Sequence, residues 1–300
     1  MERDEQTRPT LPAMDLLITG ANGQLGSALR RLLAGGPLSA DFTDVADLDL
    51  TDAAAVEQAL RERSPRAVIN CAAYTAVDKA EAHEEAARAV NETAVGVLAA
   101  ACQATGAALV HVSTDYVYHN GLDRPLREDD PTTPQSVYAA TKLAGERAAR
   151  EACAKTVVLR TSWVYGLEGH NFLRTMMRLG GERERLTVVS DQIGAPTFAD
   201  DLAAAALHAV EGLSGGTLPA GTYNYAGEGV GSWFDFAHAI MEVYGADCRV
   251  EPITTDDYPT PAKRPPYSVL DLRKARAAGF ATRHWREALQ EFRRRDTTRA

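Results

Sequence analysis

The sequence predicts an α/β fold: a doubly wound parallel sheet with a smaller C-terminal lobe. Short, nearly continuous apolar runs alternate with Ala-rich helical runs through the first half of the chain. A glycine-rich turn, Gly20-Ala-Asn-Gly-Gln-Leu-Gly26, directly follows the first apolar run. After Trp163 the alternation stops. Strands buried on both faces are continuously apolar, and strand–helix alternation implies parallel strands joined by right-handed crossovers.

The first half supplies the sheet. The expected strands are 14–20, 40–45, 67–73, 107–113 and 156–161. The expected helices are 24–34, 53–63, 79–105 with a soft interruption at Asn91, and 136–153. We therefore expect a dinucleotide-binding core at 14–165. Residues 1–13 are polar, and we expect a disordered leader there.

The second half is less regular. Segments 186–190 and 222–225 are expected to be isolated strands, and 200–210, 233–244 and 284–293 to be helices. The proline-rich segment 258–266 cannot be regular structure, because proline lacks a backbone N–H. We expect 166–300 to form mainly a substrate-binding lobe over the strand ends, with strands returning to the core.

Composition excludes several classes of function. The net charge of −9 argues against a nucleic-acid partner, which needs a basic face. No apolar run approaches the ~18–20 residues of a membrane span, and the N-terminus has no apolar signal-peptide core. The four cysteines are widely spaced and form no Cys-x-x-Cys pair, which favours a reducing cytoplasm.

The glycine-rich turn has the spacing Gly20-x-x-Gly23-x-x-Gly26. Such a turn lets the backbone approach a pyrophosphate, and the helix N-terminus then offers N–H groups to phosphate oxygens. Because the turn follows an expected strand and opens an expected helix, it indicates a Rossmann cofactor site. The expected cofactor contacts in the turn are Gly20, Asn22, Gly23, Gln24, Leu25 and Gly26.

Asp44 ends the second expected strand, where an acidic residue binds the ribose of a dinucleotide. No arginine stands beside it to hold a 2′-phosphate, which favours NADH over NADPH, although Arg30 or Arg31 would compensate if either reached the phosphate. For Asp49 the sequence also allows a helix cap before 53–63. Further cofactor contacts are expected from Asp49, Leu50, Ala72, Ala73 and Tyr74.

Tyr138 and Lys142 are four residues apart, which places them on one face of the expected helix. A free phenol, with a pKa of about 10, is a poor acid–base group at neutral pH. A neighbouring ammonium lowers that pKa and also suits the hydroxyls of a nicotinamide ribose. Thr114, after an expected strand, would offer its hydroxyl to a substrate carbonyl oxygen. We therefore expect Tyr138, Lys142 and Thr114 to be catalytic.

Longer blocks of sequence carry a resemblance to a known family. In the cofactor half these are Gly23-Gln-Leu-Gly26, Ala72-Ala-Tyr-Thr-Ala-Val-Asp-Lys-Ala-Glu81, Ser113-Thr-Asp-Tyr-Val117 and Thr141-Lys-Leu-Ala-Gly-Glu146. In the second half they are Arg160-Thr-Ser-Trp-Val-Tyr-Gly166, Asn171-Phe172, Asp191-Gln-Ile-Gly-Ala-Pro-Thr197, Tyr258-Pro-Thr-Pro-Ala262 and Arg264-Pro265. From about 14 to 289 the chain resembles the dTDP-4-dehydrorhamnose reductase family of the extended short-chain dehydrogenase/reductase superfamily.

The resemblance implies reduction by NADPH or NADH of the C4 keto group of dTDP-4-dehydro-β-L-rhamnose to dTDP-β-L-rhamnose. It implies that Tyr138 donates the proton, that Lys142 binds the cofactor and that Thr114 tunes Tyr138. The substrate contacts that it implies are Thr114, Asp115, Trp163, Asn171, Gln192 and Arg264. The glutamates that bind magnesium at a dimer contact in some members cannot be matched, so we expect no metal. A homodimer stays open.

Small departures adjoin the expected sugar site. Tyr118 stands where the family commonly has phenylalanine, and Ala139, after the catalytic tyrosine, where it often has glycine. Reduction of another NDP-4-keto-6-deoxysugar and a non-catalytic regulatory homologue stay open as alternatives. A dehydratase is disfavoured, because Tyr116 replaces the glutamate that it would need. We assign no role to the nearby His111 and His119.

Overall fold

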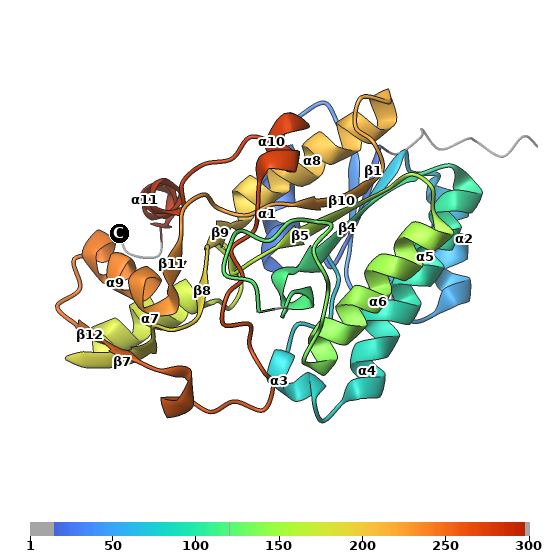
Figure 1. Ribbon diagram of the computed structural model, residues 1–300. Coiled ribbons are helices and arrows are strands. Elements are labelled where there is room, and N and C mark those ends of the chain that lie inside the picture. The colour runs from blue at the N-terminus through green and yellow to red at the C-terminus, as the bar shows by residue number, and fades with distance from the viewer. Residues whose placement is uncertain (1–14, 120, 298–300) are drawn as a thin grey trace, which may run out of the picture.

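The computed structural model describes residues 15–119 and 121–297, so the expected leader at 1–13 lies outside the described residues. Its centre is a sheet of six parallel strands in the order β10-β5-β4-β3-β1-β2 (Figure 1). The strands are β1 (Leu16–Thr19), β2 (Ala40–Thr43), β3 (Ala67–Asn70), β4 (Ala108–Thr114), β5 (Thr156–Thr161) and β10 (Gly221–Asn224). The strand order reverses between β1 and β3, which is where doubly wound sheets bind ligands.

Helices cover both faces of this sheet (Figure 1). The helices of the first half are α1 (Gln24–Leu33), α2 (Ala53–Arg63), α3 (Val77–Ala80), α4 (Glu84–Arg88), α5 (Ala94–Thr105) and α6 (Val137–Ala152). Helix α8 (Ala199–Gly215), from the second half, also packs on the sheet. Side chains alternate along each strand: Leu16 and Ile18 pack in one core cluster with α1 and α8, and Leu17 packs in another with α2 and α5. The sheet is therefore buried on both sides, as its apolar strands predict.

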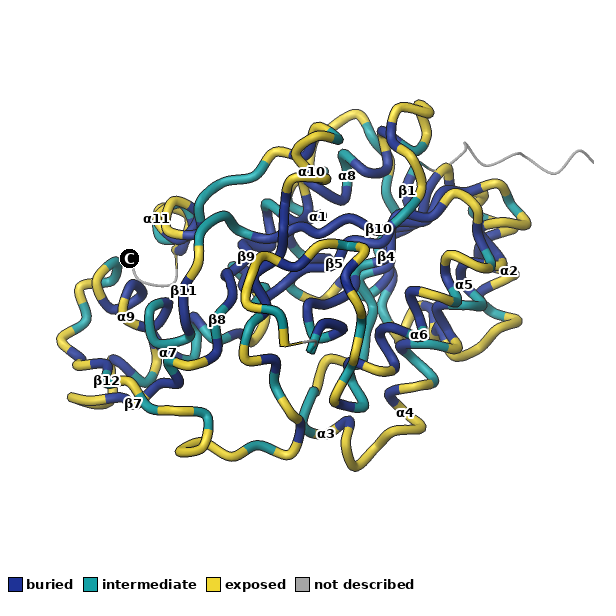
Figure 2. The backbone as a smooth tube through the Cα atoms, viewed as in Figure 1, coloured by how far each residue is buried: buried dark blue, intermediate teal, exposed yellow. Residues whose placement is uncertain are grey.

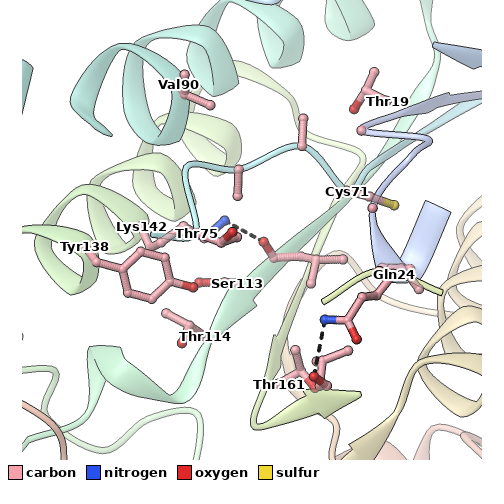
Figure 3. Close-up of a pocket in the computed structure, with 18 of the residues that line it drawn as sticks. Thr19, Gln24, Cys71, Thr75, Val90, Ser113, Thr114, Tyr138, Lys142 and Thr161 are labelled. Carbon is pink, nitrogen blue, oxygen red and sulfur yellow. Dashed lines mark hydrogen bonds between the residues drawn. The ribbon is translucent and has the colours of Figure 1, made fainter. Parts of the chain in front are cut away.

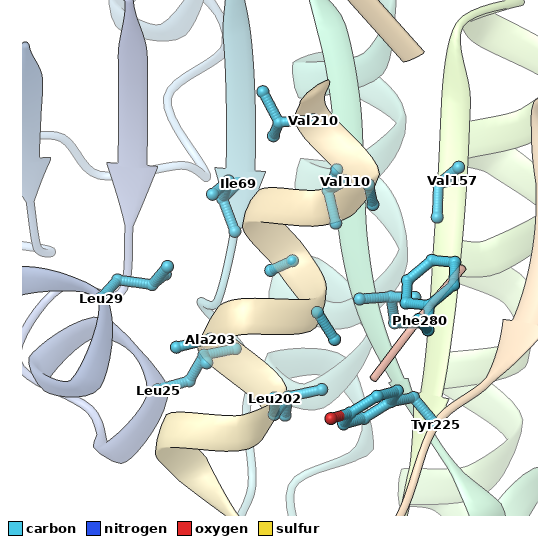
Figure 4. Packing of buried hydrophobic residues seen from close by; sticks show 14 of the residues in the cluster. Leu25, Leu29, Ile69, Val110, Val157, Leu202, Ala203, Val210, Tyr225 and Phe280 are labelled. Atoms are coloured by element: carbon cyan, nitrogen blue, oxygen red, sulfur yellow. The ribbon is translucent and has the colours of Figure 1, made fainter. Parts of the chain in front are cut away.

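Helix α8 lies over one face of the sheet (Figure 4). Its Leu202 and Ala203 pack in the same cluster as Ile69, Val110 and Val157 of three neighbouring strands. Figure 2 shows the strands as the most continuously buried part of the chain. The sheet is a rigid support whose strand ends can hold side chains in fixed positions.

A second, smaller region has its own aromatic core. Tyr165 lies among Phe198, Phe236 and Phe292, with ring centroids 5.2–5.6 Å away. Its longer elements are α7 (Phe172–Glu182), α9 (Trp233–Tyr244), α11 (Trp285–Arg295) and the parallel pair β7 (Arg185–Val189) and β12 (Arg249–Ile253). The shorter ones are β6 (Val164–Tyr165), β8 (Ile193–Gly194), β9 (Thr197–Phe198), β11 (Gly231–Ser232), α10 (Arg273–Ala277) and the 3₁₀ turn η3 (Thr255–Asp257). Figure 1 shows this region beside the carboxyl end of β5.

Two expectations about elements are wrong. The expected helix 79–105 is interrupted at Asn91 as predicted, by a π-helical turn η1 (Ala89–Thr93) that precedes α5, but the part before this turn is divided further into α3 and α4. Asn91 lies in that turn, and its amide donates to the Tyr74 carbonyl at 3.2 Å and to the Thr141 hydroxyl at 3.2 Å. The strand expected to be isolated at 222–225 is β10, which pairs with β5 in the main sheet. Helix α7 and strand β12 were not predicted.

No helix in the described part of the chain is long and apolar enough to cross a membrane.

Candidate active site

A cavity of about 840 Å³ opens at the carboxyl ends of β1, β3, β4 and β5 (Figure 3). It lies at the point where the strand order reverses, so its place follows from topology alone. The predicted site residues that line it are Gly20, Asn22, Gly23, Gln24, Leu25, Asp44, Asp49, Leu50, Ala72, Ala73, Thr114, Asp115, Tyr138, Lys142, Trp163 and Asn171. The predicted residues Gly26, Tyr74, Gln192 and Arg264 are not part of its lining.

The glycine-rich turn fits a dinucleotide pyrophosphate. Gly20 has φ +65°, and a Cβ there would lie 2.6 Å from the Ala72 nitrogen, so only glycine fits. Gly23 is the N-cap of α1, and no side chain caps that helix end, so the N–H groups of its first turn remain for a ligand. A Cβ on Gly26 would lie 2.5 Å from the Cα of Ala21, so Gly26 serves the packing of the turn.

Asp44 directly follows β2, where it is expected to contact the ribose of the cofactor. Its carboxylate accepts hydrogen bonds from the backbone N–H groups of Asn22 and Val45, both at 2.9 Å, which ties it to the glycine-rich turn. Asp49 accepts from the Thr51 hydroxyl at 2.7 Å. The alternative that Asp49 caps the next helix is wrong, because Asp52 caps α2.

Tyr138 and Thr114 meet at the cavity wall. Their side chains are hydrogen-bonded to each other, and Figure 3 shows the Tyr138 ring pointing from α6 toward the end of β4. Ser136 caps α6 by accepting from the Ala139 N–H at 3.2 Å, which fixes where the tyrosine stands on the first turn. The Tyr116 ring packs edge-on against it, with centroids 5.6 Å apart.

Lys142 lies one turn along α6 and is 2% exposed. Its Nζ donates to the Val112 carbonyl at 2.7 Å, and burial lowers its pKa to about 8. The expected lowering of the Tyr138 pKa is not found: burial raises it to about 12, which exceeds the opposing effect of the Thr114 hydrogen bond. In this structure Tyr138 is therefore a phenol that keeps its proton at neutral pH.

Asp115 is almost fully buried beside these groups. One carboxylate oxygen accepts from the Thr114 hydroxyl at 3.0 Å. Burial raises the pKa of Asp115 to about 6, against the opposing effect of hydrogen bonds from the Ser268 and Thr114 hydroxyls.

Trp163 is held in a strained position. It is a non-glycine residue with φ +48°, and its indole stacks on Trp233 with centroids 3.8 Å apart. A Cβ on Gly194 would lie 2.8 Å from the Trp163 ring, so glycine is needed there. Left-handed backbone at a bulky residue costs roughly 1–2 kcal/mol and persists where surrounding structure enforces it. Trp163 and Trp233 form an aromatic wall of the cavity.

Three expected substrate contacts already have protein partners. Asn171 caps α7 and donates through its amide to the Gln24 side chain at 3.0 Å. Gln192 donates to the Thr255 hydroxyl at 3.1 Å. Arg264 forms a bidentate pair with Asp78, at 2.8 and 3.0 Å, which joins the proline-rich segment to α3.

Sequence reasoning did not predict several residues of the cavity wall, Thr161 and Trp233 among them. Thr161 ends β5, and its buried hydroxyl has no partner among the described residues. Thr161 lies at the end of an expected strand. Because doubly wound sheets bind ligands at the carboxyl ends of their strands, its position alone would have identified it. Trp233 comes from α9, in the other region, and no local pattern brings it to the strand ends. No cluster of three or more residues suited to hold a metal ion occurs among the described residues.

Comparisons with known proteins agree along nearly the whole chain. A family model described as the RmlD substrate binding domain matches residues 14–297. The dTDP-4-dehydrorhamnose reductase of Streptomyces griseus is 45% identical over 280 residues, 92% of this chain and 91% of that protein. The crystal structure of a dTDP-4-dehydrorhamnose reductase from Clostridium acetobutylicum has a TM-score of 0.89 and 42% identity, covering 93% of this chain and 98% of that one. The reductase from Bacillus anthracis, solved in complex with NADP, has a TM-score of 0.89 and 37% identity, covering 94% and 99%.

The parallel sheet, its glycine-rich turn and the adjoining Tyr-x-x-x-Lys helix define the class of protein, an oxidoreductase that uses a nicotinamide cofactor. The family match covers every described residue, and the two relatives above 40% identity, from Streptomyces griseus and Clostridium acetobutylicum, share one name. The chain belongs to the dTDP-4-dehydrorhamnose reductase family.

Proposed function

We propose that this protein reduces the C4 keto group of dTDP-4-dehydro-β-L-rhamnose to the hydroxyl of dTDP-β-L-rhamnose, with Tyr138 as proton donor. One observation carries the proposal: the hydrogen-bonded pair of Tyr138 and Thr114 lies on the wall of the cavity that also contains the glycine-rich turn. The relatives from Streptomyces griseus and Clostridium acetobutylicum are named for this reaction, which supplies the substrate.

The proton step follows from the state of Tyr138. Its pKa of about 12 keeps the phenol protonated at neutral pH, as a proton donor requires. The nicotinamide dinucleotide, when bound, supplies a hydride to C4. As that C–H bond forms, O4 takes the proton of Tyr138 and the phenolic O–H bond breaks. Thr114 orients the phenol, and the ammonium form of Lys142 stabilises the phenolate that remains.

We propose NADH as the preferred cofactor. Asp44 and Asp49 line the cavity, and their charge opposes a 2′-phosphate. Neither arginine that would compensate is free in this structure: Arg30 stacks on the Phe42 ring at 4.2 Å, and Arg31 pairs with Asp200 at 2.5 Å. The NADP complex of the Bacillus anthracis relative keeps NADPH as the alternative.

We further propose that 14–165 binds the cofactor and 166–300 mainly the sugar nucleotide, with Asp115 and Trp163 at the sugar. The described cysteines are free thiols, which supports a cytoplasmic location. The homodimer stays a prediction that no observation tests.

The test is the substitution Tyr138→Phe. It removes only the transferable proton, so cofactor affinity should stay within about twofold while kcat falls about 10²–10⁴-fold. Tyr118→Phe is the matched control, since it removes a buried phenolic hydroxyl outside the cavity lining. Turnover of Tyr138→Phe within threefold of the unmodified protein would refute the assignment of the proton donor.

A further inference from the structure

Behind Lys142 lies a chain of buried polar side chains that the proposed mechanism does not use. Thr19, Asn70 and His111 stand side by side on β1, β3 and β4, at positions paired in the sheet. Their exposure is 1%, 1% and 0%, and that of Lys142 is 2%. A buried polar chain requires a partner for each hydrogen, because an unmatched donor costs about 1–3 kcal/mol. The direction of every hydrogen bond in the chain can therefore be worked out.

The backbone fixes that direction. The Ala72 N–H donates to Asn70 Oδ1 at 3.1 Å, and the Thr19 hydroxyl donates to the same oxygen at 2.8 Å. A backbone N–H can only donate, so Asn70 must turn its oxygen to Ala72 and its NH₂ group to His111. The Asn70 amide nitrogen lies 3.1 Å from His111 Nδ1, which is therefore an acceptor.

His111 is consequently the tautomer with its proton on Nε2. Burial lowers the pKa of His111 well below its ordinary value, so the imidazole is neutral at neutral pH. Nε2 lies 3.4 Å from Lys142 Nζ. An N–H that faces an amine matches the lone pair of the neutral form and opposes the ammonium form.

The other groups around Lys142 do not remove this effect. The Val112 carbonyl accepts from Nζ in either protonation state. Glu146 on α6 and Cys71 after β3 favour the ammonium, but burial exceeds both. Tyr138, on the same face of α6, is neutral at this pH. His111 is the neighbour whose hydrogen-bond direction depends on a distant backbone group.

We propose that His111 is a positioning residue that acts through Lys142: the chain from Ala72 through Asn70 fixes the His111 tautomer, and the Nε2–H that results sets how readily the Lys142 amine holds a proton. The glycine-rich turn packs directly on Ala72, so the chain joins the pyrophosphate end of the cofactor site to its catalytic lysine.

The first test measures the tautomer and needs no turnover. Long-range ¹H–¹⁵N correlation on the uniformly labelled full chain at pH 7 distinguishes an imidazole protonated on Nε2 from one protonated on Nδ1. His111, assigned by the loss of its signals in His111→Gln or through the backbone, should show the Nε2–H pattern. The Nδ1–H pattern, or a charged imidazole, would overturn the inference.

The second test rests on the proposed function, because it uses the pH dependence of reduction. The ammonium of Lys142 is the active form, so kcat/KM should fall as pH rises through its pKa of about 8. In His111→Gln the amide oxygen can face Nζ and accept from the ammonium, so the fall should move up by about one pH unit. Asn70→Asp should move it in the same direction, because a carboxylate draws the proton to Nδ1 and leaves the Nε2 lone pair facing Nζ.

Val110→Ala is the control, since Val110 lies on the same strand in the apolar core. It should leave the pH of the fall unchanged. An unchanged pH of the fall in both His111→Gln and Asn70→Asp, with cofactor binding retained, would contradict the inference. Loss of all turnover in the unmodified protein would instead count against the proposed function and leave the tautomer measurement to decide this one.

Discussion

Two buried cations, Arg160 and Lys142, differ in their partners. Arg160 is paired with a carboxylate, whereas Lys142 contacts only neutral groups among the described residues. Arg160 on β5 donates to Glu146 at 2.7, 3.0 and 3.1 Å and to the Tyr118 hydroxyl at 2.6 Å. Lys142, one turn before Glu146 on α6, faces a backbone carbonyl and a neutral histidine. Burial disfavours the charge of Arg160, but the hydrogen bonds and charge of Glu146 outweigh it and raise its pKa, whereas the pKa of Lys142 falls to about 8.

The difference separates a structural charge from a functional one. Arg160 is satisfied within the protein and lies outside the cavity lining, so it fastens α6 to β5. Lys142 lines the cavity and is left incompletely paired, so a ligand can complete its hydrogen bonds. A buried charge without a counterion costs stability, and such a cost is expected at a functional site.

The largest expected effect is on the paired cation. Glu146→Gln leaves Arg160 buried without a counter-charge and deprives the Ser113 hydroxyl of its carboxylate acceptor. The free energy of unfolding should fall by about 3–5 kcal/mol, measured by urea denaturation. Glu151→Gln, an exposed position on the same helix, should change it by less than about 0.5 kcal/mol. A loss below 1 kcal/mol in Glu146→Gln would show that Arg160 does not depend on Glu146 for its stability in the core.

The unpaired cation should behave in the opposite way. Lys142→Met removes a buried ammonium and should raise the free energy of unfolding at pH 7 by about 3 kcal/mol while abolishing turnover, since the pKa falls from 10.5 to about 8 in the fold. Below pH 8 Lys142 of the unmodified protein is protonated in both the folded and the unfolded state, so the full cost of burying its ammonium is present. Between pH 8 and 10.5 the unfolded state binds more protons, so the unmodified protein gains stability as pH rises and the advantage of Lys142→Met disappears.

Lys155→Met is the control for that experiment, because Lys155 is exposed in the loop between α6 and β5. It should show no such dependence on pH. Equal stability of Lys142→Met and the unmodified protein at pH 7 would show that the ammonium is better satisfied than the structure indicates.

A smaller effect is expected where charge selects the cofactor. Asp44→Ala removes the carboxylate tied to the glycine-rich turn and should raise the ratio of kcat/KM for NADPH to that for NADH by about tenfold, or ~1.4 kcal/mol. Glu57→Ala, which removes an exposed charge from α2, should leave the ratio unchanged. If Asp44→Ala leaves it unchanged too, another residue sets the preference.

The smallest effect is expected from the Tyr118 hydroxyl, which accepts a hydrogen bond from Arg160. Tyr118→Phe removes one acceptor of Arg160 and keeps the ring that stacks on the guanidinium, with 4.9 Å between its centroid and Cζ. The free energy of unfolding should fall by about 1 kcal/mol, with kcat unchanged. A fall in kcat of tenfold would mean that the two cations are not independent.

Five of the six strands of the sheet were predictable from the sequence because their signals are local. Strands β1 to β5 overlap the predicted strand segments, and the helix expected at 53–63 is α2 with the same bounds. The site at the strand ends followed from the same signals. Sixteen of the twenty predicted site residues line one cavity.

The remainder depends on contacts between distant residues. The π-helical turn exists where Gly145 of α6 approaches Asn91 so closely that a Cβ would lie 1.9 Å from its carbonyl oxygen. Trp233 reaches the cavity through its stack on Trp163, seventy positions earlier. The role of His111 depends on the direction of a hydrogen bond that begins at Ala72. No local pattern records these pairings.

The most direct measurement combines the purified protein with dTDP-4-dehydro-6-deoxyglucose, a matched 3,5-epimerase and NADH or NADPH, and follows cofactor absorbance together with product NMR. We predict oxidation of the cofactor only when the epimerase is present, and a product with the L-rhamno configuration. Oxidation without the epimerase, or another configuration at C4, would assign the protein to a different deoxysugar. No oxidation with either cofactor would contradict the account and favour a non-catalytic regulatory homologue.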